Sequence, residues 1–220
     1  MAVFAGPEIV NDVLVLHLDA ANPRSYPGSG TIWTDLSGNG NNGTLVNGVG
    51  YNNANNGSMV FDGVNDYVNI GQPPSLSNIG SNFSIQCYVK WNGVGNSWQG
   101  IVTKGRNTSN WYGLWVNNSQ FAFGVLGGNF FSNTISANTW YYACITNGNL
   151  GRRIYINGLQ SASNPTQINF DPVADLVVGF AQNTAEWFNG NISQVSIYNR
   201  ALSQQEVRQN FEATRSRYGI

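Results

Sequence analysis

Near its C-terminus the chain reads Ile192-Ser193-Gln194-Val195-Ser196-Ile197-Tyr198-Asn199-Arg200-Ala201-Leu202-Ser203. An alternation of this kind is typical of a β-strand, because successive side chains point to opposite faces of a sheet. The pattern predicts one face with Ile192, Gln194 and Ser196 and another with Ser193, Val195 and Ile197. A tight corner at residues 198–200 is predicted to end the strand.

A short helix is predicted directly after this corner. Ser203 and Glu206 have the spacing of a capping box, in which each side chain satisfies a backbone N–H at the helix start. Leu202 and Val207 have the spacing of a hydrophobic staple. We therefore expect the chain to end in one strand and one closing helix, the helix at residues 204–216.

The rest of the chain contains short period-two runs separated by turn residues. These runs predict strands at residues 13–18, 83–91, 113–116, 121–125, 140–146 and 176–179. In the run 83–91, the alternation predicts one buried face and one solvent-exposed face. The pair Asn157-Gly158 predicts a hairpin turn, since both residue types tolerate a positive φ. Such spacing favours one sandwich domain over residues 12–220, preceded by an N-terminal arm at residues 1–11.

The composition is poor in charge. Of the 220 residues 10% are charged, and the formal net charge is -1, whereas about 25% charged residues is typical of soluble domains. This balance predicts no electrostatic attraction to nucleic acid or to an anionic membrane. No apolar stretch approaches the roughly 18 residues of a membrane span, so no membrane insertion is expected. Residues 1–8 lack the basic and apolar parts of a secretory signal, which predicts synthesis in the cytoplasm without a signal peptide.

Four stretches, taken in order, resemble one superfamily. They are Leu14-Val15-Leu16-His17-Leu18-Asp19 leading into residues 33–44, Phe61-Asp62-Gly63 with Asp66-Tyr67-Val68, residues 140–143 with 154–158, and the ending described above. Over about residues 12–218 the chain resembles the laminin-G-like, concanavalin A-like lectin/glucanase superfamily. The resemblance implies an all-β fold, a concanavalin A-like jelly-roll β-sandwich of two antiparallel sheets with a short C-terminal helix. Members of this class mostly bind ligands, and a minority are enzymes.

The glutamates argue against a glycosidase. Glucanases of this superfamily carry two carboxylates on one strand, spaced E-x-D-x-x-E or E-x-D-x-E, so that both face one cleft. This chain has four glutamates, Glu8, Glu186, Glu206 and Glu212, and none has a carboxylate two residues away. We therefore predict that the protein is not an enzyme.

The single histidine and the two cysteines are predicted to be structural. For His17, on the first strand, a hydrogen-bonded structural role is favoured over a Ser-His-Asp triad, whose partners the sequence does not place. Cys87 and Cys144 both fall in apolar strand-like runs. Buried free thiols are favoured for them, and one disulfide is the alternative.

One turn is rich in oxygen ligands of the kind that calcium prefers. It contains Asp62, Asn65 and Asp66, and Asp35 is predicted to lie near it. Laminin-G-like relatives often hold a calcium ion at the rim of the sandwich, and many have an acidic residue where this chain has Ser193. The resemblance therefore implies a possible calcium site that lacks one usual ligand. The alternative is that Asp62 and Asp66 accept hydrogen bonds from their own turn. No cofactor is predicted to be required.

Aromatic residues make up 13% of the chain, and most are expected in the core. Some instead lie in or beside segments rich in Gly, Asn, Ser and Gln. These are Trp98, Trp111, Tyr112, Phe130, Phe131 and Trp187. Flat rings flanked by amides suit carbohydrate, because a ring covers the apolar face of a sugar while amides bind its hydroxyls. Contacts with a partner protein and packing of the loops themselves are the alternatives.

The sequence thus favours a recognition module over a catalyst. Stand-alone domains of this type resemble virion proteins of bacterial viruses, which implies a decoration or fibre protein on the surface of a phage particle. Its partners would be other virion proteins or copies of itself, and its rim loops would bind cell-surface glycans. The alternatives are an architectural capsid-decoration protein without saccharide binding and, least favoured, a carbohydrate-active enzyme.

Overall fold

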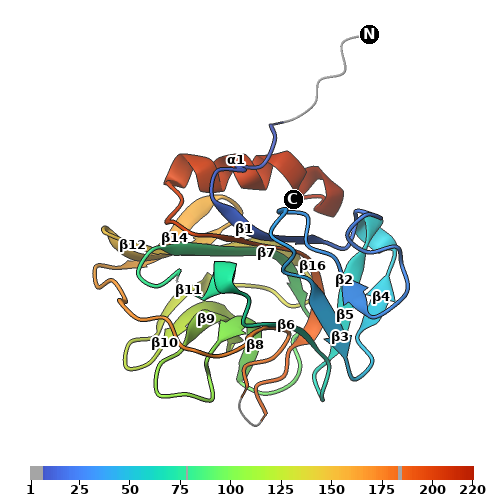
Figure 1. The fold of residues 1–220 in the computed structure, drawn as a ribbon, viewed down its shortest axis with the longest axis horizontal. Helices are drawn as coiled ribbons and strands as arrows, with labels where there is room; N and C mark the ends of the chain where they lie inside the picture. The colour runs from blue at the N-terminus through green and yellow to red at the C-terminus, as the bar shows by residue number, and fades with distance from the viewer. Residues whose placement is uncertain (1–6, 78, 183–184) are drawn as a thin grey trace.

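The computed structural model describes residues 7–77, 79–182 and 185–220. They form two antiparallel sheets packed face to face, with one helix on the outer face of the first sheet (Figure 1). The predicted jelly-roll β-sandwich with a short C-terminal helix is therefore confirmed. Within these ranges no helix is both long enough and apolar enough to cross a membrane.

The first sheet has eight strands in the described residues. In spatial order, seven are β14 (Leu159–Asn164), β13 (Gly151–Ile156), β12 (Trp140–Gly148), β7 (Phe83–Trp91), β16 (Asn189–Tyr198), β5 (Ser58–Asp62) and β4 (Gly50–Asn52). The eighth, β1 (Leu14–Asp19), also pairs with β16. The first and last strands of the chain are thus neighbours.

The second sheet also has eight strands in the part of the chain that the structure describes. Their order is β11 (Phe130–Thr134), β10 (Gln120–Val125), β9 (Tyr112–Asn117), β8 (Trp98–Lys104), β15 (Leu176–Val178), β6 (Tyr67–Gly71), β3 (Gly43–Val46) and β2 (Ile32–Trp33). The helical segments are α1 (Gln204–Thr214) and the 3₁₀ turns η1 (Ala54–Asn56), η2 (Pro74–Leu76) and η3 (Arg215–Tyr218).

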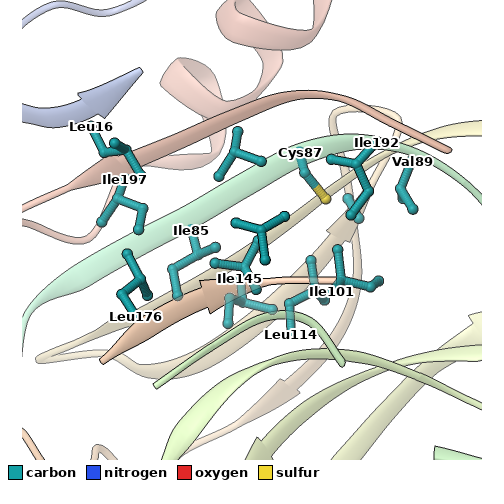
Figure 2. Packing of buried hydrophobic residues seen from close by; sticks show 14 of the residues in the cluster. Leu16, Ile85, Cys87, Val89, Ile101, Leu114, Ile145, Leu176, Ile192 and Ile197 are labelled. Atoms are coloured by element: carbon teal, nitrogen blue, oxygen red, sulfur yellow. The ribbon is translucent and has the colours of Figure 1, made fainter. Parts of the chain in front are cut away.

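The core lies between the two sheets. Ile85, Cys87 and Val89 of β7 point inward because alternate residues of a strand share a face. They belong to the same buried cluster as Leu114 of β9, and all four are at most 1% exposed (Figure 2). The range of β7 equals the predicted strand 83–91.

The opposite face of β7 is buried too, so the prediction that it faces solvent is wrong. Ser84, Gln86 and Tyr88 are at most 2% exposed. Tyr142 donates a hydrogen bond to Gln86 Oε1 at 2.5 Å, and Asn210 of α1 donates to the same oxygen at 3.0 Å. The helix therefore covers a polar strand face whose groups find partners inside the protein.

A β-bulge changes the predicted faces of β16. The pairing of β16 with β7 shifts register between Ile192 and Gln194. Because one extra residue reverses the alternation, Ile192 shares the core with Val195 and Ile197. The prediction that placed Ile192 on the opposite face from Val195 is therefore wrong. Ser193, at the bulge, accepts a hydrogen bond from Tyr218 Oη at 2.9 Å.

The predicted start of α1 is confirmed. The backbone N–H of Glu206 donates to Ser203 Oγ at 3.3 Å, and the backbone N–H of Ser203 donates to Glu206 Oε2 at 2.8 Å. Leu202 and Val207 are both buried in the layer beneath the helix. The α-helix ends at Thr214, two residues before the predicted end, because the chain continues as the 3₁₀ turn η3.

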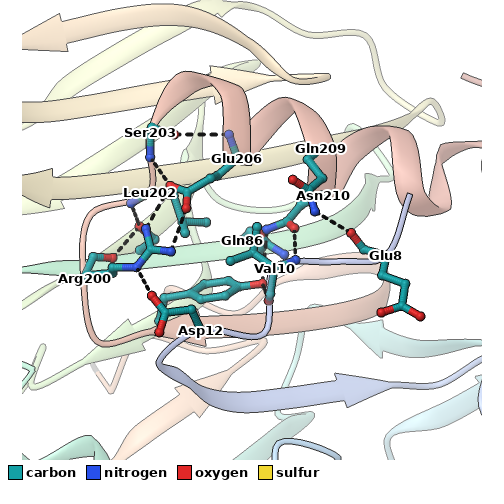
Figure 3. Close-up of polar contacts among 12 residues, drawn as sticks. Glu8, Val10, Asp12, Gln86, Arg200, Leu202, Ser203, Glu206, Gln209 and Asn210 are labelled. Atoms are coloured by element: carbon teal, nitrogen blue, oxygen red, sulfur yellow. Dashed lines mark hydrogen bonds and ion pairs between the residues drawn. The ribbon is translucent and has the colours of Figure 1, made fainter. Parts of the chain in front are cut away.

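The described part of the N-terminal arm is fastened to α1 (Figure 3). The backbone N–H of Val10 donates to Asn210 Oδ1 at 2.7 Å, and Tyr198 Oη donates to the Val10 carbonyl at 2.9 Å. Gln209 donates to the Glu8 carbonyl at 2.8 Å. Residues 1–6 of the predicted arm lie outside the described residues.

Cys87 and Cys144 are buried free thiols, as predicted. They lie on the neighbouring strands β7 and β12 but on opposite faces, Cys87 between the sheets and Cys144 beneath α1. Side chains that point apart do not form a disulfide. Burial raises the pKa of the Cys144 thiol well above its usual value, so this thiol stays protonated and unreactive.

Candidate functional site: an aromatic trough on the second sheet

The outer face of β8, β9 and β10 carries a floor of small residues around Trp115. Trp115 of β9 lies opposite Gly100 of β8 and Ala122 of β10, while Gly113 of β9 lies opposite Gly124 of β10. A Cβ atom at Gly124 would lie 2.6 Å from the Trp115 ring. These small residues therefore let the indole of Trp115 lie directly on the strands.

Further rings stand on this floor. The Trp111 and Trp115 rings meet edge to face with centroids 5.4 Å apart, and the Trp98 and Phe131 centroids are 5.9 Å apart. A cavity of about 140 Å³ opens between Trp98, Trp111, Trp115 and two polar residues, Arg106 and Asn129. We call Trp98, Arg106, Trp111, Trp115, Asn129 and Phe131 the aromatic trough.

The accessible rings of the trough are Trp98 and Phe131. Phe131 is 38% exposed and Trp98 is half-buried, whereas Trp111 is 8% and Trp115 is 1% exposed. The two deeper tryptophans form the base and the two outer rings form its edge. A ligand would therefore meet Trp98 and Phe131 first.

A buried carboxylate holds the base in place. Glu186 accepts hydrogen bonds from Arg106 Nε at 3.2 Å and Nη2 at 2.8 Å, and from Trp115 Nε1 at 3.1 Å. The Arg106 guanidinium lies 4.4 Å from the centre of the Trp111 ring, within the range of a cation–π contact. Glu186 thus fixes the positions of an arginine and a tryptophan at once.

Three of the six predicted aromatic ligand contacts come together in the trough: Trp98, Trp111 and Phe131. Two others point into the core instead. Tyr112 is fully buried, stacks on Phe83 at 4.5 Å and donates a hydrogen bond to Asp171. Phe130 packs against the core next to Phe123, with centroids 5.7 Å apart. Neither ring is part of the trough. Tyr112 follows Trp111 and Phe130 precedes Phe131, and successive side chains of an extended segment point to opposite faces.

The sixth predicted contact, Trp187, belongs to a separate aromatic group. Its ring stacks on Phe180 with centroids 3.7 Å apart and an interplanar angle of 11°. Tyr67 of β6 lies 6.2 Å away. This group lies at β6, beyond β15, and we do not include it in the trough.

Four residues of this region were not predicted as part of a site: Arg106, Trp115, Asn129 and Glu186. Arg106 and Glu186 are 80 positions apart, so no local pattern joins them. One signal was available for Trp115. Gly113 on one strand and Ala122 and Gly124 on the next are small residues on the face that carries Trp115, while Leu114 and Phe123 alternate with them, and such a glycine-rich face leaves room for a flat ring.

The residues proposed for calcium already have hydrogen-bond partners. Asp35 accepts from the backbone N–H groups of His17, Ser37 and Asn41. Asp62 Oδ1 accepts from two N–H groups of its own turn, those of Val64 and Asn65. The Asp66 carboxylate accepts from the Asp62 N–H, and burial together with the Asp62 charge raises the pKa of Asp66.

These contacts match the alternative in which the aspartates stabilise turns. Among the residues that the structure describes, no three His, Cys, Asp or Glu side chains gather as a metal site. Ser193, at the position where relatives often carry an acid, donates to the Gly57 carbonyl and accepts from Tyr218. Calcium binding stays a prediction to be tested in solution.

His17 has the geometry of a structural residue. Its Nδ1 lies 2.9 Å from Ser196 Oγ, and Ser196 is fully buried. In the described residues no carboxylate hydrogen-bonds the imidazole ring, although Asp19 and Asp35 lie close enough to act on its charge. Burial lowers the pKa of His17, and the two aspartates oppose this effect. A nucleophile and base pair without solvent access does not match a working triad.

Solved structures with the same fold include recognition domains and parts of glycosidases. Domain 4 of AbnA, an extracellular GH43 arabinanase from Geobacillus stearothermophilus, solved in complex with arabinotriose, has a TM-score of 0.68 and 18% identity, covering 90% of this chain and 98% of that one. The binding domain of Paraclostridial Mosquitocidal Protein 1 has a TM-score of 0.71 and 18% identity, covering 91% and 52%. Trypanosoma rangeli sialidase has a TM-score of 0.72 and 14% identity, covering 94% and 34%.

These likenesses concern the fold. The present chain spans about half of the mosquitocidal binding domain and about a third of the sialidase. A search among curated proteins found no matching sequence. The family model for the concanavalin A-like lectin/glucanases superfamily matches residues 62–208, which is well over half of the chain. The chain belongs to the concanavalin A-like lectin/glucanase superfamily.

Proposed function

We propose that this chain is a non-catalytic carbohydrate-recognition module and that its aromatic trough binds a saccharide. The observation that carries the proposal is the cavity between the accessible ring of Trp98 and the deeper rings of Trp111 and Trp115, with Arg106 and Asn129 at its wall. A sugar ring placed on Trp98 would bury its apolar face there, while its edge would face Asn129 and Arg106. The geometry thus supplies both kinds of contact that a sugar needs.

The polar groups of the trough are held in position and can donate hydrogen bonds to the hydroxyls of a sugar. Asn129 Oδ1 accepts the Val125 N–H at 2.9 Å, which fixes the amide. Its NH₂ group has no hydrogen-bond partner among the described residues and is free to donate. Arg106 uses Nε and Nη2 on Glu186, and within the same residues its Nη1 is unpaired. Fixed donors with a free N–H favour binding, because little side-chain entropy remains to be lost.

A catalytic role is not favoured. A glycosidase needs two carboxyl groups on either side of the scissile bond. Glu186 is the carboxylate at the base of the trough, and its contacts in the described residues are with the N–H donors of Arg106 and Trp115. A carboxylate held by three donors positions its neighbours, and within the described residues no carboxylate lines the cavity itself. We therefore favour recognition over hydrolysis.

We place this module on the surface of a bacteriophage particle, as a decoration or fibre protein that contacts cell-surface glycans. The charge-poor composition, with 10% charged residues, supports a place on a particle surface. Contact with glycans is supported by the occurrence of the fold in a binding domain and in a domain solved with arabinotriose. Other virion proteins or copies of the chain would hold it on the particle. An architectural decoration protein without saccharide binding is the rival proposal.

The test is a glycan-array screen of the purified protein, in calcium and in EDTA, followed by affinity measurements on variants. Trp98→Ala should weaken binding of the best saccharide at least about tenfold, which corresponds to about 1.4 kcal/mol. Trp187→Ala is the matched control, since it removes the same side chain from the aromatic group at β6. Melting curves verify that both variants are folded.

Two results would contradict the proposal. If no saccharide on the array binds, in calcium or in EDTA, the architectural role is favoured. Equal weakening by Trp98→Ala and Trp187→Ala would mean that the trough is not the binding surface. Binding that disappears in EDTA would instead show that calcium is required, contrary to the expectation that no cofactor is needed.

A further inference from the structure

A second and larger cavity lies on the other side of the sandwich. It has a volume of about 630 Å³ and lies between the outer face of β12–β14 and the segment that leads into α1. This volume is within the usual range for small-molecule sites, about 300–1,000 Å³. The cavity belongs to the first sheet, whereas the aromatic trough belongs to the second, so it is independent of the function proposed above.

The floor of this cavity carries an arginine without a partner. Thr146 of β12 and Arg153 of β13 are directly paired across the strands, and Tyr155 and Gln160 lie beside them. Arg153 is half-buried, yet within the described residues its guanidinium makes no hydrogen bond and no ion pair. Such a group in a concave site favours an anionic partner, because its donors fit a carboxylate in a fork geometry.

The neighbouring arginine of β13, Arg152, does have partners for its guanidinium. Arg152 points to the other face of β13, is 3% exposed, and donates to the carbonyls of Thr166 and Gly128, both at 2.8 Å. Its donors are therefore used in holding the loops together. Arg153 has no comparable structural task.

The wall of the cavity does not neutralise Arg153. Glu206 lines the cavity, but its carboxylate accepts two hydrogen bonds from Arg200, at 2.7 and 2.8 Å (Figure 3). Arg200 also contacts Asp12 at 3.1 Å. Arg200 and the helix cap hold the pKa of Glu206 down, to about 2, so that this ion pair persists. The positive charge of Arg153 is therefore not neutralised by the residues that line the cavity.

The remaining lining groups suit a sugar better than a bare ion. Gln160 and Asn149 carry exposed amides with no partner among the described residues, and amides both donate to and accept from hydroxyls. Leu150, at the rim, is 77% exposed and offers an apolar contact. A small inorganic anion would use the arginine alone and leave these groups unused.

We infer that this cavity is a second binding site, specific for a carboxylated sugar whose carboxylate pairs with Arg153. Gln160 and Asn149 contact its hydroxyls, and Leu150 covers one edge of the ring. The carboxylate sets the specificity, since a neutral sugar leaves the arginine unpaired. Raised salt weakens binding, because the guanidinium is only half-buried.

The experiment is a calorimetric titration of the full chain with glucuronic, galacturonic and N-acetylneuraminic acid, each beside its uncharged methyl ester. At least one acid should bind at least tenfold more tightly than its ester. Arg153→Gln should remove this preference. Arg208→Gln is the matched control, because Arg208 is an exposed arginine of α1 that pairs with Glu212 outside the cavity.

Each other outcome overturns the inference. No binding of any acid, or equal binding of acid and ester, would exclude a carboxylate site. An unchanged preference in Arg153→Gln would place the anion elsewhere. Melting curves of Arg153→Gln separate loss of binding from loss of folding.

Discussion

Replacing Glu186 by glutamine removes one negative charge beneath the aromatic trough and keeps the size of the side chain. The carboxylate accepts three hydrogen bonds, two from Arg106 and one from Trp115 Nε1. A glutamine offers one oxygen, and its NH₂ group then faces an N–H donor of Arg106 or Trp115. At least one donor therefore loses its partner.

The magnitude follows from how deeply each donor is buried. Trp115 is 1% exposed, so an unpaired indole N–H there would cost about 1–3 kcal/mol. The glutamine oxygen therefore takes the Oε2 position, where it keeps Trp115 Nε1 and Arg106 Nε while its NH₂ group faces Arg106 Nη2. The Arg106 side chain is 26% exposed, so water replaces part of the lost ion pair at a cost of about 0–1 kcal/mol. We expect a loss of about 1 kcal/mol in the free energy of unfolding, or about 2–4 °C in the melting temperature for a domain of this size.

The assay is chemical denaturation followed by far- and near-UV circular dichroism, the latter reporting on the tryptophans. The matched control is Glu212→Gln, which removes a carboxylate paired with Arg208 and Arg215 on the exposed side of α1. We expect the control to unfold at the denaturant concentration of the wild type. If Glu186→Gln is no less stable than Glu212→Gln, Glu186 does not hold the trough in place and the reasoning is refuted.

Three further predictions concern groups outside the trough. The free energy of unfolding should fall as the pH drops below about 6.5, because burial lowers the pKa of His17 and the unfolded chain then binds more protons than the folded one. Urea titrations between about pH 5 and 8 measure this dependence of stability on pH, which should be weaker in His17→Gln than in the wild type. Cys87 and Cys144 should resist a thiol reagent in the native protein and react in denaturant, and rapid native labelling would contradict their burial. The melting temperature should be equal in calcium and in EDTA because Asp62 already caps its own turn, and a calcium-dependent rise abolished by Asp62→Asn would restore the metal site.

Strand positions were predictable because alternation is a local property. The hairpin turn at Asn157-Gly158 and the capping box at Ser203 and Glu206 are likewise local, and all of them are found in the structure. The solvent side of β7 was predicted wrongly for a physical reason. Gln86 hydrogen-bonds to Asn210 of α1, 124 positions away, and a period-two pattern does not distinguish water from a distant polar partner.

The aromatic site was predictable only in part. Trp111-Tyr112 and Phe130-Phe131 are adjacent pairs, and one member of each faces out while the other enters the core. Which member faces out depends on the strand register, and a shift of one residue exchanges the two. The sequence therefore placed the right segments at the site, while the choice between neighbouring rings required the pairing of β9 and β10 with their neighbours.

The two outer faces of the sandwich are covered in different ways, and the difference bears on function. On the first sheet α1 covers β7, and polar groups such as Gln86 and Asn210 are bonded to each other. On the second sheet Trp115 and its neighbouring rings cover a floor of small residues. Here a cavity remains beside Trp98, and within the described residues the NH₂ group of Asn129 has no partner. The cavity and this exposed amide are the features on which the proposed saccharide site rests.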